Sequence, residues 1–354
     1  MAQLVAHLHG MQGVRGSSPL SSTQFLSNPE DGLFMSETSA SNGRGLPLQK
    51  IPSRWSAKDL PNLEGKRFLI TGATSGIGKE AARELARVGA KVTIAARSIE
   101  KAEAVKKEIS NSRIDILQLD LSDLESVRKA ARGIEYEIDV LILNAGIMAI
   151  PLTKTADDFE MQMGTNHLGH FAFAGLIRDR IKSRVVTISS QAHRMGSFSD
   201  SSISSIRDIC LGRNEYSAWG AYGASKLANL LFTFELERRS SANNWGFKAL
   251  AAHPGYSNTN LQSVGPKVRG NLWEERATAF MNGVIAQSAS RGALPTLCAA
   301  TFPNLYGASF IGPDGFMEMR GFPRAVRARS IAYDQTLATN LWSVSEELTG
   351  VVWR

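Results

Sequence analysis

The sequence feature that most restricts the possible folds lies at residues 66–89. There a strand, a glycine-rich turn and a helix follow one another directly. Residues 66–71 form an apolar, strand-like run, residues 71–78 read TGATSGIG, and residues 76–89 carry a helical pattern that Gly89 ends. Such a turn brings the backbone close to a pyrophosphate, to which the helix N-terminus offers free N–H groups. A tight turn without a ligand is the alternative, but the strand–turn–helix order favours a nucleotide site.

The same alternation of strands and helices continues toward the C-terminus. Apolar runs separated by helical patterns predict a parallel sheet covered by helices on both faces, with right-handed crossovers. Ser122, with Glu125 three residues later, has the spacing of a helix capping box. We therefore expect an α/β fold with a Rossmann-type doubly wound parallel sheet of about seven strands. These strands should span residues 66–71, 91–96, 114–120, 139–144, 184–189, 247–253 and 307–312.

The N-terminal stretch differs from the rest of the chain. Residues 1 to about 45 are rich in Ser, Gly and Asn and show no sustained hydrophobic period. We predict that residues 1–45 are a disordered tail and that residues 46–354 form a single domain. The tail has no compact apolar region of the kind that a secretory signal needs. Translation from Met35 is as compatible with this pattern as translation from Met1, and the choice leaves the chemistry of the domain unchanged.

Charge and cysteine content exclude several classes of function. The formal net charge is +7, but Lys and Arg are spread along the chain without an aromatic-rich basic stripe, so we expect no nucleic-acid partner. Cys210 and Cys298 are the two cysteines; their separation excludes zinc-binding and redox C-x-x-C spacings and fits a reducing cytoplasm. No apolar run reaches the ~20 residues of a membrane span. We therefore predict a cytoplasmic protein without a metal.

The spacing of the glycine turn, T-G-x-x-x-G-x-G, resembles that of the short-chain dehydrogenase/reductase family. The resemblance extends from about Gly65 to the C-terminus and implies an oxidoreductase that binds a nicotinamide dinucleotide. Asp120 is its candidate for contact with the adenine; an aspartate that caps the following helix is an equal alternative. The residues that the resemblance assigns to the cofactor are Gly72, Thr74, Ser75, Gly76, Ile77, Gly78, Asp120, Leu121, Asn144, Ala145, Gly146, Tyr222, Lys226, Pro254, Gly255 and Thr259.

The end of the second strand distinguishes between the two dinucleotides. An NAD site usually has an acidic residue there to bind the ribose hydroxyls, whereas this strand ends Ala95-Ala96-Arg97. An arginine pairs with a 2′-phosphate through charge-assisted hydrogen bonds. Ser75, just before the second glycine of the turn, adds a hydrogen-bonding group but no charge. Mainly because of Arg97 we predict NADP(H) rather than NAD(H); an exposed arginine at the start of the next helix is the alternative.

Tyr222 and Lys226 form a Y-x-x-x-K pattern, which places both side chains on one face of a helix. A nearby ammonium, together with the positive charge of an oxidised nicotinamide, would favour the phenolate and lower the pKa of a tyrosine from its ordinary value near 10, which suits an acid and base at neutral pH. The pattern alone is common, but the other catalytic positions of the family are also filled. The resemblance assigns Ser190, rather than the adjacent Ser189, to the substrate carbonyl, and Asn166 to a water relay that reaches the lysine.

The long segment between Ser190 and Tyr222 resembles the branch of the family that contains retinol dehydrogenases, WW-domain oxidoreductases and protochlorophyllide reductases. This branch implies a small, hydrophobic carbonyl or alcohol as substrate. We predict a helical lid over the site at residues 261–295. Its large apolar side chains line the pocket or, alternatively, pack as an ordinary amphipathic helix; they are Trp273, Phe280 and Met281.

The predicted function is the interconversion of a carbonyl and an alcohol with NADP(H), in which Tyr222 is the general acid and base. The alternative is a catalytically idle NADP(H)-binding protein that senses the cofactor or acts as a scaffold. The intact Ser190, Tyr222 and Lys226 favour the enzyme. His167 and His253 are interpreted as structural, because proton transfer is already assigned to Tyr222. A monomer and a homo-oligomer are both compatible with the sequence.

Overall fold

The computed structural model describes residues 48–109, 113–256 and 287–354. Within these residues the chain forms an eight-stranded sheet with the order β3-β2-β1-β4-β5-β6-β7-β8. Strands β1 to β7 are parallel, and β8 is antiparallel to β7. The predicted α/β class and doubly wound parallel sheet are confirmed, and β8 is an additional strand. The strands are β1 (Arg67–Thr71), β2 (Lys91–Ala96), β3 (Ile114–Gln118), β4 (Ile138–Leu143), β5 (Ile181–Ile188), β6 (Lys248–Ala252), β7 (Phe310–Pro313) and β8 (Pro323–Ala325).

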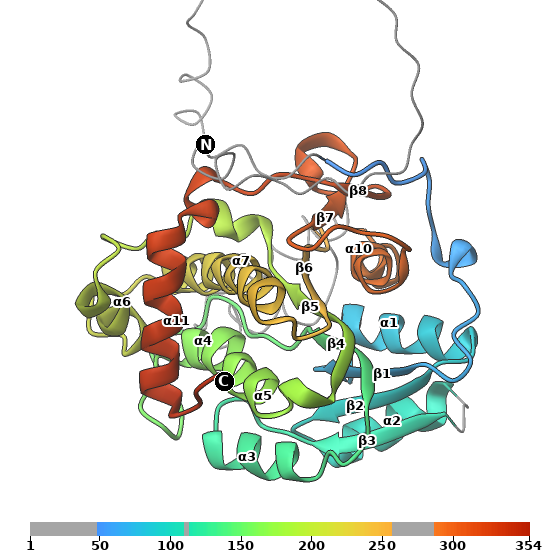
Figure 1. Cartoon of the computed structure of the whole chain (residues 1–354), viewed down its shortest axis with the longest axis horizontal. Helices are drawn as coiled ribbons and strands as arrows, with labels where there is room; N and C mark the ends of the chain where they lie inside the picture. The colour runs from blue at the N-terminus through green and yellow to red at the C-terminus, as the bar shows by residue number, and fades with distance from the viewer. Residues whose placement is uncertain (1–47, 110–112, 257–286) are drawn as a thin grey trace, which may run out of the picture. The chain divides into compact units, whose positions relative to one another are not determined.

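Helices cover both faces of the sheet (Figure 1). Helices α1, α2 and α10 bury their apolar side chains against one face, and α3, α5, α7 and α11 bury theirs against the other. Strands β1, β2 and β4 are buried along nearly their whole length, so their sequences read as continuous apolar runs. The helices are α1 (Gly76–Arg87), α2 (Ile99–Ile109), α3 (Leu124–Arg132), α4 (Met161–Met163), α5 (Gly169–Leu176), α6 (Ile203–Cys210), α7 (Ala218–Asn243), α10 (Ala289–Thr301) and α11 (Gln335–Thr349).

The ends of α1 and α3 show how far local sequence signals determine helix boundaries. Helix α1 ends at Arg87, and Gly89 follows with φ +98°, as a helix-ending glycine requires. The predicted cap of α3 was wrong. Its N-cap is Asp123, whose carboxylate accepts hydrogen bonds from the backbone N–H groups of Glu125 and Ser126. The hydroxyl of Ser122 instead donates to Asp120. A carboxylate at this position also interacts favourably with the helix dipole, which a serine cannot do.

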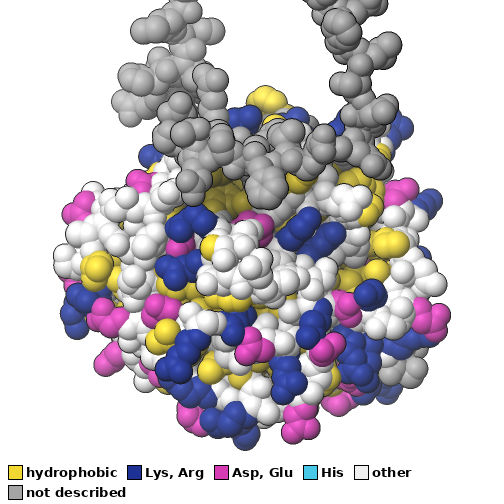
Figure 2. Space-filling view, viewed as in Figure 1, with side chains coloured by type: hydrophobic (Ala, Val, Ile, Leu, Met, Phe, Trp, Pro, Cys, Tyr) yellow, Lys and Arg dark blue, Asp and Glu magenta, His cyan; other side chains and the backbone are white. Residues whose placement is uncertain are grey.

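Charged side chains of both signs are interspersed on the surface. On the face drawn in Figure 2, Lys and Arg lie among Asp and Glu rather than gathering in one stripe. Several form exposed ion pairs, such as Lys66 with Asp139 and Arg207 with Glu347. On this face the positive side chains are therefore interspersed with negative ones.

Parts of the predicted tail and lid lie beyond what the structure describes. At the C-terminal end of the lid range, Ala289 begins α10, and residues 292–300 of this helix are buried against the sheet and α1. Among the described helices, none combines the length and the apolar character that crossing a membrane requires. The predictions that fall outside the described residues concern the tail at 1–45, Thr259, the lid from 261 to 286, and Trp273, Phe280 and Met281 within it.

Candidate active site

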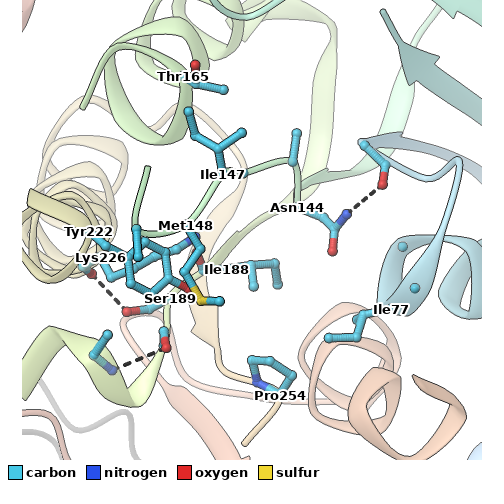
Figure 3. Close-up of a pocket in the computed structure, with 18 of the residues that line it drawn as sticks. Ile77, Asn144, Ile147, Met148, Thr165, Ile188, Ser189, Tyr222, Lys226 and Pro254 are labelled. Carbon is cyan, nitrogen blue, oxygen red and sulfur yellow. Dashed lines mark hydrogen bonds between the residues drawn. The ribbon is translucent and has the colours of Figure 1, made fainter. Parts of the chain in front are cut away.

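A cleft of about 1010 Å³ opens at the carboxyl ends of the parallel strands. Its walls come from the segments that follow β1 to β6, together with the start of α7 and the loop between β7 and β8. The cleft spans the point where the strand order reverses, between β1 and β4, which is where open α/β sheets bind their ligands. Figure 3 shows side chains from these segments turned toward this common space.

The glycine turn packs tightly against the segment after β4. A Cβ atom on Gly72 would lie 2.6 Å from the Ala145 Cα, and one on Gly78 would lie 2.4 Å from the Asn144 Nδ2. The Asn144 amide donates to the carbonyl oxygens of Thr71 and Gly72 at 2.8 and 3.2 Å. Close packing therefore requires these two glycines. The sequence had predicted a second reason for them, the close approach of the backbone to a phosphate.

The first turn of α1 fits a bound phosphate. Ser75, Gly76, Ile77 and Gly78 all line the cleft. Within the described residues, the Ser75 hydroxyl makes no capping hydrogen bond to the N–H groups of this turn. These N–H groups and the positive end of the helix dipole point to the same space, which is the arrangement that binds a dinucleotide pyrophosphate. The residues present therefore fit the predicted cofactor.

The far end of the cleft is lined by Arg97, Asp120 and Leu121. Arg97 directly follows β2 and is exposed, so its guanidinium is accessible to a ligand. Asp120 accepts hydrogen bonds from the backbone N–H and the hydroxyl of Ser122, at 3.0 and 2.6 Å. Since Asp123 caps α3, Asp120 stabilises the turn before the helix rather than the helix itself. We call this the arginine end of the cleft.

The opposite end, which we call the tyrosine end, is formed by Ser190, Tyr222 and Lys226. Tyr222 and Lys226 lie one turn apart on α7 and are 5% and 4% exposed. The Lys226 ammonium donates to the Ile188 carbonyl at 3.1 Å and lies 5.7 Å from the centre of the Tyr222 ring. The end of β5 thus fixes the lysine directly beside the tyrosine.

The two neighbouring serines have different partners. The Ser189 hydroxyl donates to the Lys226 carbonyl at 2.8 Å and so holds α7 against β5 (Figure 3). The Ser190 hydroxyl accepts from the Ala192 N–H at 3.2 Å, and the Ser190 side chain acts to lower the pKa of Tyr222. The geometry therefore brings Ser190, rather than Ser189, to the tyrosine hydroxyl.

Burial shifts the acid–base properties of the tyrosine end. It raises the pKa of Tyr222 to about 12, against the smaller, opposite effect of the hydrogen bond from Ser190. It also lowers the pKa of Lys226 to about 8. The predicted lowering of the Tyr222 pKa relied on Lys226 together with an oxidised nicotinamide, and the protein without the nicotinamide does not produce it. The chain holds this tyrosine as a neutral phenol, the form that donates a proton.

Asn166 lies behind the cleft wall, in the π-helical turn of residues 164–168. Its side chain accepts from the Ile147 N–H at 2.8 Å and donates to the Ile147 carbonyl at 3.0 Å. A Cβ atom on Gly146 would lie 3.1 Å from the Asn166 Oδ1 and 3.3 Å from the Lys226 Nζ, so this segment passes closely between the two side chains. The structure thus shows Asn166 as the support of the segment after β4.

The sequence did not predict a group of apolar side chains that lies at the tyrosine end. Trp219 lies three residues before Tyr222 on α7, a spacing that places both on one helix face and that could have identified it. Met317 and Met319 come from the loop between β7 and β8, and no local signal connects them with the cleft. The lining residues that were missed include Met148, Gln191, Arg194, Met195, Trp219, Tyr256, Met317 and Met319.

Comparison with known proteins gives this arrangement a family. Residues 66–205 match the profile of short chain dehydrogenases. The chain is 36% identical to retinol dehydrogenase 11 of Homo sapiens over 316 residues, which cover 86% of this chain and 92% of the relative. The chain belongs to the short-chain dehydrogenase/reductase (SDR) family. It is also 38% identical to retinol dehydrogenase 12 of Mus musculus over 302 residues, which cover 82% of this chain and 88% of that one.

A solved structure supports the same assignment. An uncharacterised protein from Mycobacterium paratuberculosis shares 43% sequence identity with this SDR protein and superimposes with a TM-score of 0.71, covering 85% of this chain and 99% of the other. The SDR family consists of oxidoreductases that use a nicotinamide dinucleotide, and the relatives place this chain in the branch of the retinol dehydrogenases. The resemblance noted in the sequence is therefore confirmed at the level of family and branch.

The segment after β6 completes the cleft as the SDR pattern predicts. Pro254 and Gly255 follow β6 and line the cleft, and Figure 3 shows Pro254 among the side chains around it. Thr259, the last residue of the predicted SDR cofactor set, lies outside the described residues. Apart from Thr259, and from Asn166 behind the wall, every predicted site residue lines this one cleft.

Proposed function

We propose that this SDR protein interconverts a carbonyl and an alcohol with NADP(H), and that Tyr222 is its general acid and base. The observation that carries the proposal is the convergence of the Ser190 and Tyr222 hydroxyls and the Lys226 ammonium at one end of a cleft whose other end is lined by Arg97. This order along the cleft is the order in which a bound NADP(H) would present its 2′-phosphate and its nicotinamide.

The reaction needs a proton as well as a hydride. The chemistry that NADPH would supply when bound is a hydride for the carbonyl carbon, and negative charge would then build on the carbonyl oxygen. Tyr222 donates its phenolic proton to this oxygen, and Ser190 donates a hydrogen bond to the same atom. The Lys226 ammonium beside the ring stabilises the phenolate that remains, and the reverse sequence oxidises an alcohol.

The protonation states support this assignment. A Tyr222 hydroxyl whose pKa is raised to about 12 stays protonated at neutral pH, and its proton donation depends on the Lys226 ammonium beside the ring to stabilise the phenolate that forms. Lys226, with a pKa lowered to about 8, still carries a positive charge at neutral pH in most molecules. The low exposure of both side chains keeps water from competing with the substrate oxygen for the proton.

Arg97 supports the choice of NADP(H). Its exposed guanidinium lies at the cleft beyond the end of β2, where a 2′-phosphate would form a charge-assisted contact. The glycine turn and the start of α1 would hold the pyrophosphate, and Lys226 would bind the nicotinamide ribose.

The apolar rim supports a hydrophobic substrate. Met195, Trp219 and Met317 line the tyrosine end and are 58%, 46% and 69% exposed, so a ligand there would cover apolar surface. The relatives are named for their action on retinol, which makes retinaldehyde a natural member of any substrate panel. The buried free thiols of Cys210 and Cys298 support a reducing, cytoplasmic location.

A screen of NADPH oxidation with aldehydes, ketones and quinones, retinaldehyde included, tests the proposal. We expect saturable turnover with at least one hydrophobic carbonyl and no turnover without one. Tight NADPH binding with no turnover of any carbonyl would instead favour a protein that senses the cofactor.

A further inference from the structure

Glu318 is a carboxylate at the tyrosine end for which the proposed chemistry has no role. It lies in the loop that joins β7 to β8, and its side chain is 14% exposed. The Gln191 amide donates to its Oε2 at 2.5 Å, and the His253 Nε2 lies 3.0 Å from the same oxygen. The Arg194 guanidinium lies 3.6 Å from its Oε1. Partners from two other segments therefore meet on this one carboxylate.

The hydrogen bonds determine the state of the His253 ring. The Gly255 N–H donates to its Nδ1 at 3.2 Å, so Nδ1 carries no proton and Nε2 carries the one that is donated to Glu318. Burial lowers the pKa of His253, which keeps the ring neutral. Burial acts to raise the pKa of Glu318, but the hydrogen bonds of His253 and Gln191 and the charge of Arg194 hold it below its ordinary value. The pair is thus a neutral histidine and a carboxylate.

The surrounding backbone is shaped to allow this contact. A Cβ atom on Gly312, in β7, would lie 2.0 Å from the His253 Nε2, so only glycine leaves room for the ring to reach Glu318. Met317 and Glu318 both adopt left-handed backbone conformations, with φ of +50° and +56°. Non-glycine residues hold such conformations only where their surroundings enforce them, and such sites concentrate at functional positions.

The partners of Glu318 adjoin the residues of the proposed reaction. Gln191 directly follows Ser190, which is the N-cap of the short turn of residues 191–194. His253 directly precedes Pro254 and Gly255, which line the cleft. On the other side of the carboxylate, Met317 and Met319 flank Glu318 and line the same cleft. The Tyr256 N–H also donates to the Met319 carbonyl at 2.7 Å, which holds this loop against the segment after β6.

We propose that Glu318 is a positioning residue, which fixes the Ser190 turn and the Pro254 turn relative to each other and to the rim formed by Met317 and Met319. Its carboxylate connects the ends of β5 and β6 to the loop that follows β7. The Ser190 hydroxyl, the Pro254 turn and the rim formed by Met317 and Met319 therefore stay fixed relative to one another. The kinetic consequences of this inference rest on the proposed function. The contacts through which Glu318 joins the Ser190 turn and the Pro254 turn, which we call the clamp, can be measured without turnover.

The kinetic test compares Glu318→Ala, Glu318→Gln and Phe316→Ala. Phe316 lies in the same loop, is 79% exposed and does not line the cleft, so its removal controls for general loosening of the loop. Misplacing Ser190 should lower kcat of Glu318→Ala by about ten- to a hundredfold and raise the substrate KM. Glutamine still accepts the hydrogen bonds of Gln191 and His253, so Glu318→Gln should lose only about threefold.

Rates are expressed per NADPH-binding site, counted by fluorescence titration of each variant. A loss of folded protein would reduce the number of sites but leave KM and the rate per site unchanged. The affinity for NADPH should stay within about twofold of wild type, because Arg97 and the glycine turn are untouched. A Glu318→Ala enzyme with wild-type kcat per site and KM would overturn the proposal.

Amide hydrogen exchange of the cofactor-free protein tests the clamp itself. We expect Glu318→Ala to exchange faster in the two segments that the carboxylate joins, at residues 191–195 and 253–256, while Phe316→Ala leaves both unchanged. Unchanged exchange in either segment of Glu318→Ala would refute the clamp. A wild type that turns over no carbonyl would contradict the proposed function, and the exchange result would still decide whether Glu318 holds the two segments together.

Discussion

Burial, rather than the charge of the neighbouring lysine, dominates the acid–base properties of single residues at the tyrosine end. Tyr222 and Lys226 are nearly inaccessible, and each pKa shifts toward the neutral form of its side chain. In the protein alone Tyr222 is therefore protonated at neutral pH. The arginine end differs, because Arg97 is exposed and its guanidinium is accessible to a ligand.

A single residue, Arg97, should produce a preference between the two cofactors. A charge-assisted contact between Arg97 and the 2′-phosphate should make NADPH bind about ten- to a hundredfold more tightly than NADH. Arg97→Asp should erase or reverse the preference, while Lys101→Asp, an exposed change of the same charge on α2, should have little effect. Fluorescence titration with both cofactors measures this. Equal affinity of the wild type for NADPH and NADH would remove the role of Arg97.

At the scale of elements, local chemistry decides where each helix begins. Asp123 caps α3 with two hydrogen bonds, whereas Ser122 bonds to Asp120. Ser189 and Asn166 show the same principle for packing, since their side chains tie α7 to β5 and the π-helical turn to the segment after β4. The elements are therefore fixed to each other by side-chain to backbone hydrogen bonds close to the cleft.

The cap of α3 provides a direct test. Asp123→Ala should lower the free energy of unfolding by about 1 kcal/mol, because two helix N–H groups lose their acceptor. Ser122→Ala should cost less than about 0.5 kcal/mol, since this hydroxyl caps no helix. Urea unfolding of both variants measures the difference. A larger loss for Ser122→Ala would mean that the helix begins as the capping-box pattern suggested.

The sheet and most of the cleft were predictable from the sequence because they depend on local signals. Continuous apolar runs identified the parallel strands, and the glycine turn and the Y-x-x-x-K pattern identified both ends of the cleft. Glu318 was not predictable, because its partners Gln191 and His253 are 127 and 65 residues away in the chain. The raised pKa of Tyr222 was missed for the same reason, since burial is a property of the packed fold.

At the scale of the whole molecule, buried histidines link folding to pH. Burial lowers the pKa of His167 to about 3 and those of His170 and His193 to about 4. Their pKa in the unfolded chain is near 6.5, so the unfolded state binds protons that the folded state refuses. The stability they contribute is therefore fully present above pH about 6.5 and is lost as the pH falls toward 4.

This linkage predicts acid sensitivity of the fold. Below pH about 6 each of the three histidines should reduce the free energy of unfolding by about 1.4 kcal/mol per pH unit. His167→Gln should remove its own contribution of about 1.4 kcal/mol per pH unit from this slope. Urea unfolding at pH 7, 6 and 5 measures it. A free energy of unfolding that stays constant from pH 7 to pH 5 would show that these histidines are not held neutral.

Tyr222→Phe tests most directly whether Tyr222 supplies the proton. This change keeps the ring and its packing but removes the hydroxyl. With a carbonyl that the wild type reduces, the account predicts a loss of turnover of about 10²-fold or more, with NADPH binding nearly unchanged. Initial rates of NADPH oxidation and a parallel NADPH titration of both proteins give the two quantities. A Tyr222→Phe enzyme that retains wild-type turnover would contradict the mechanism.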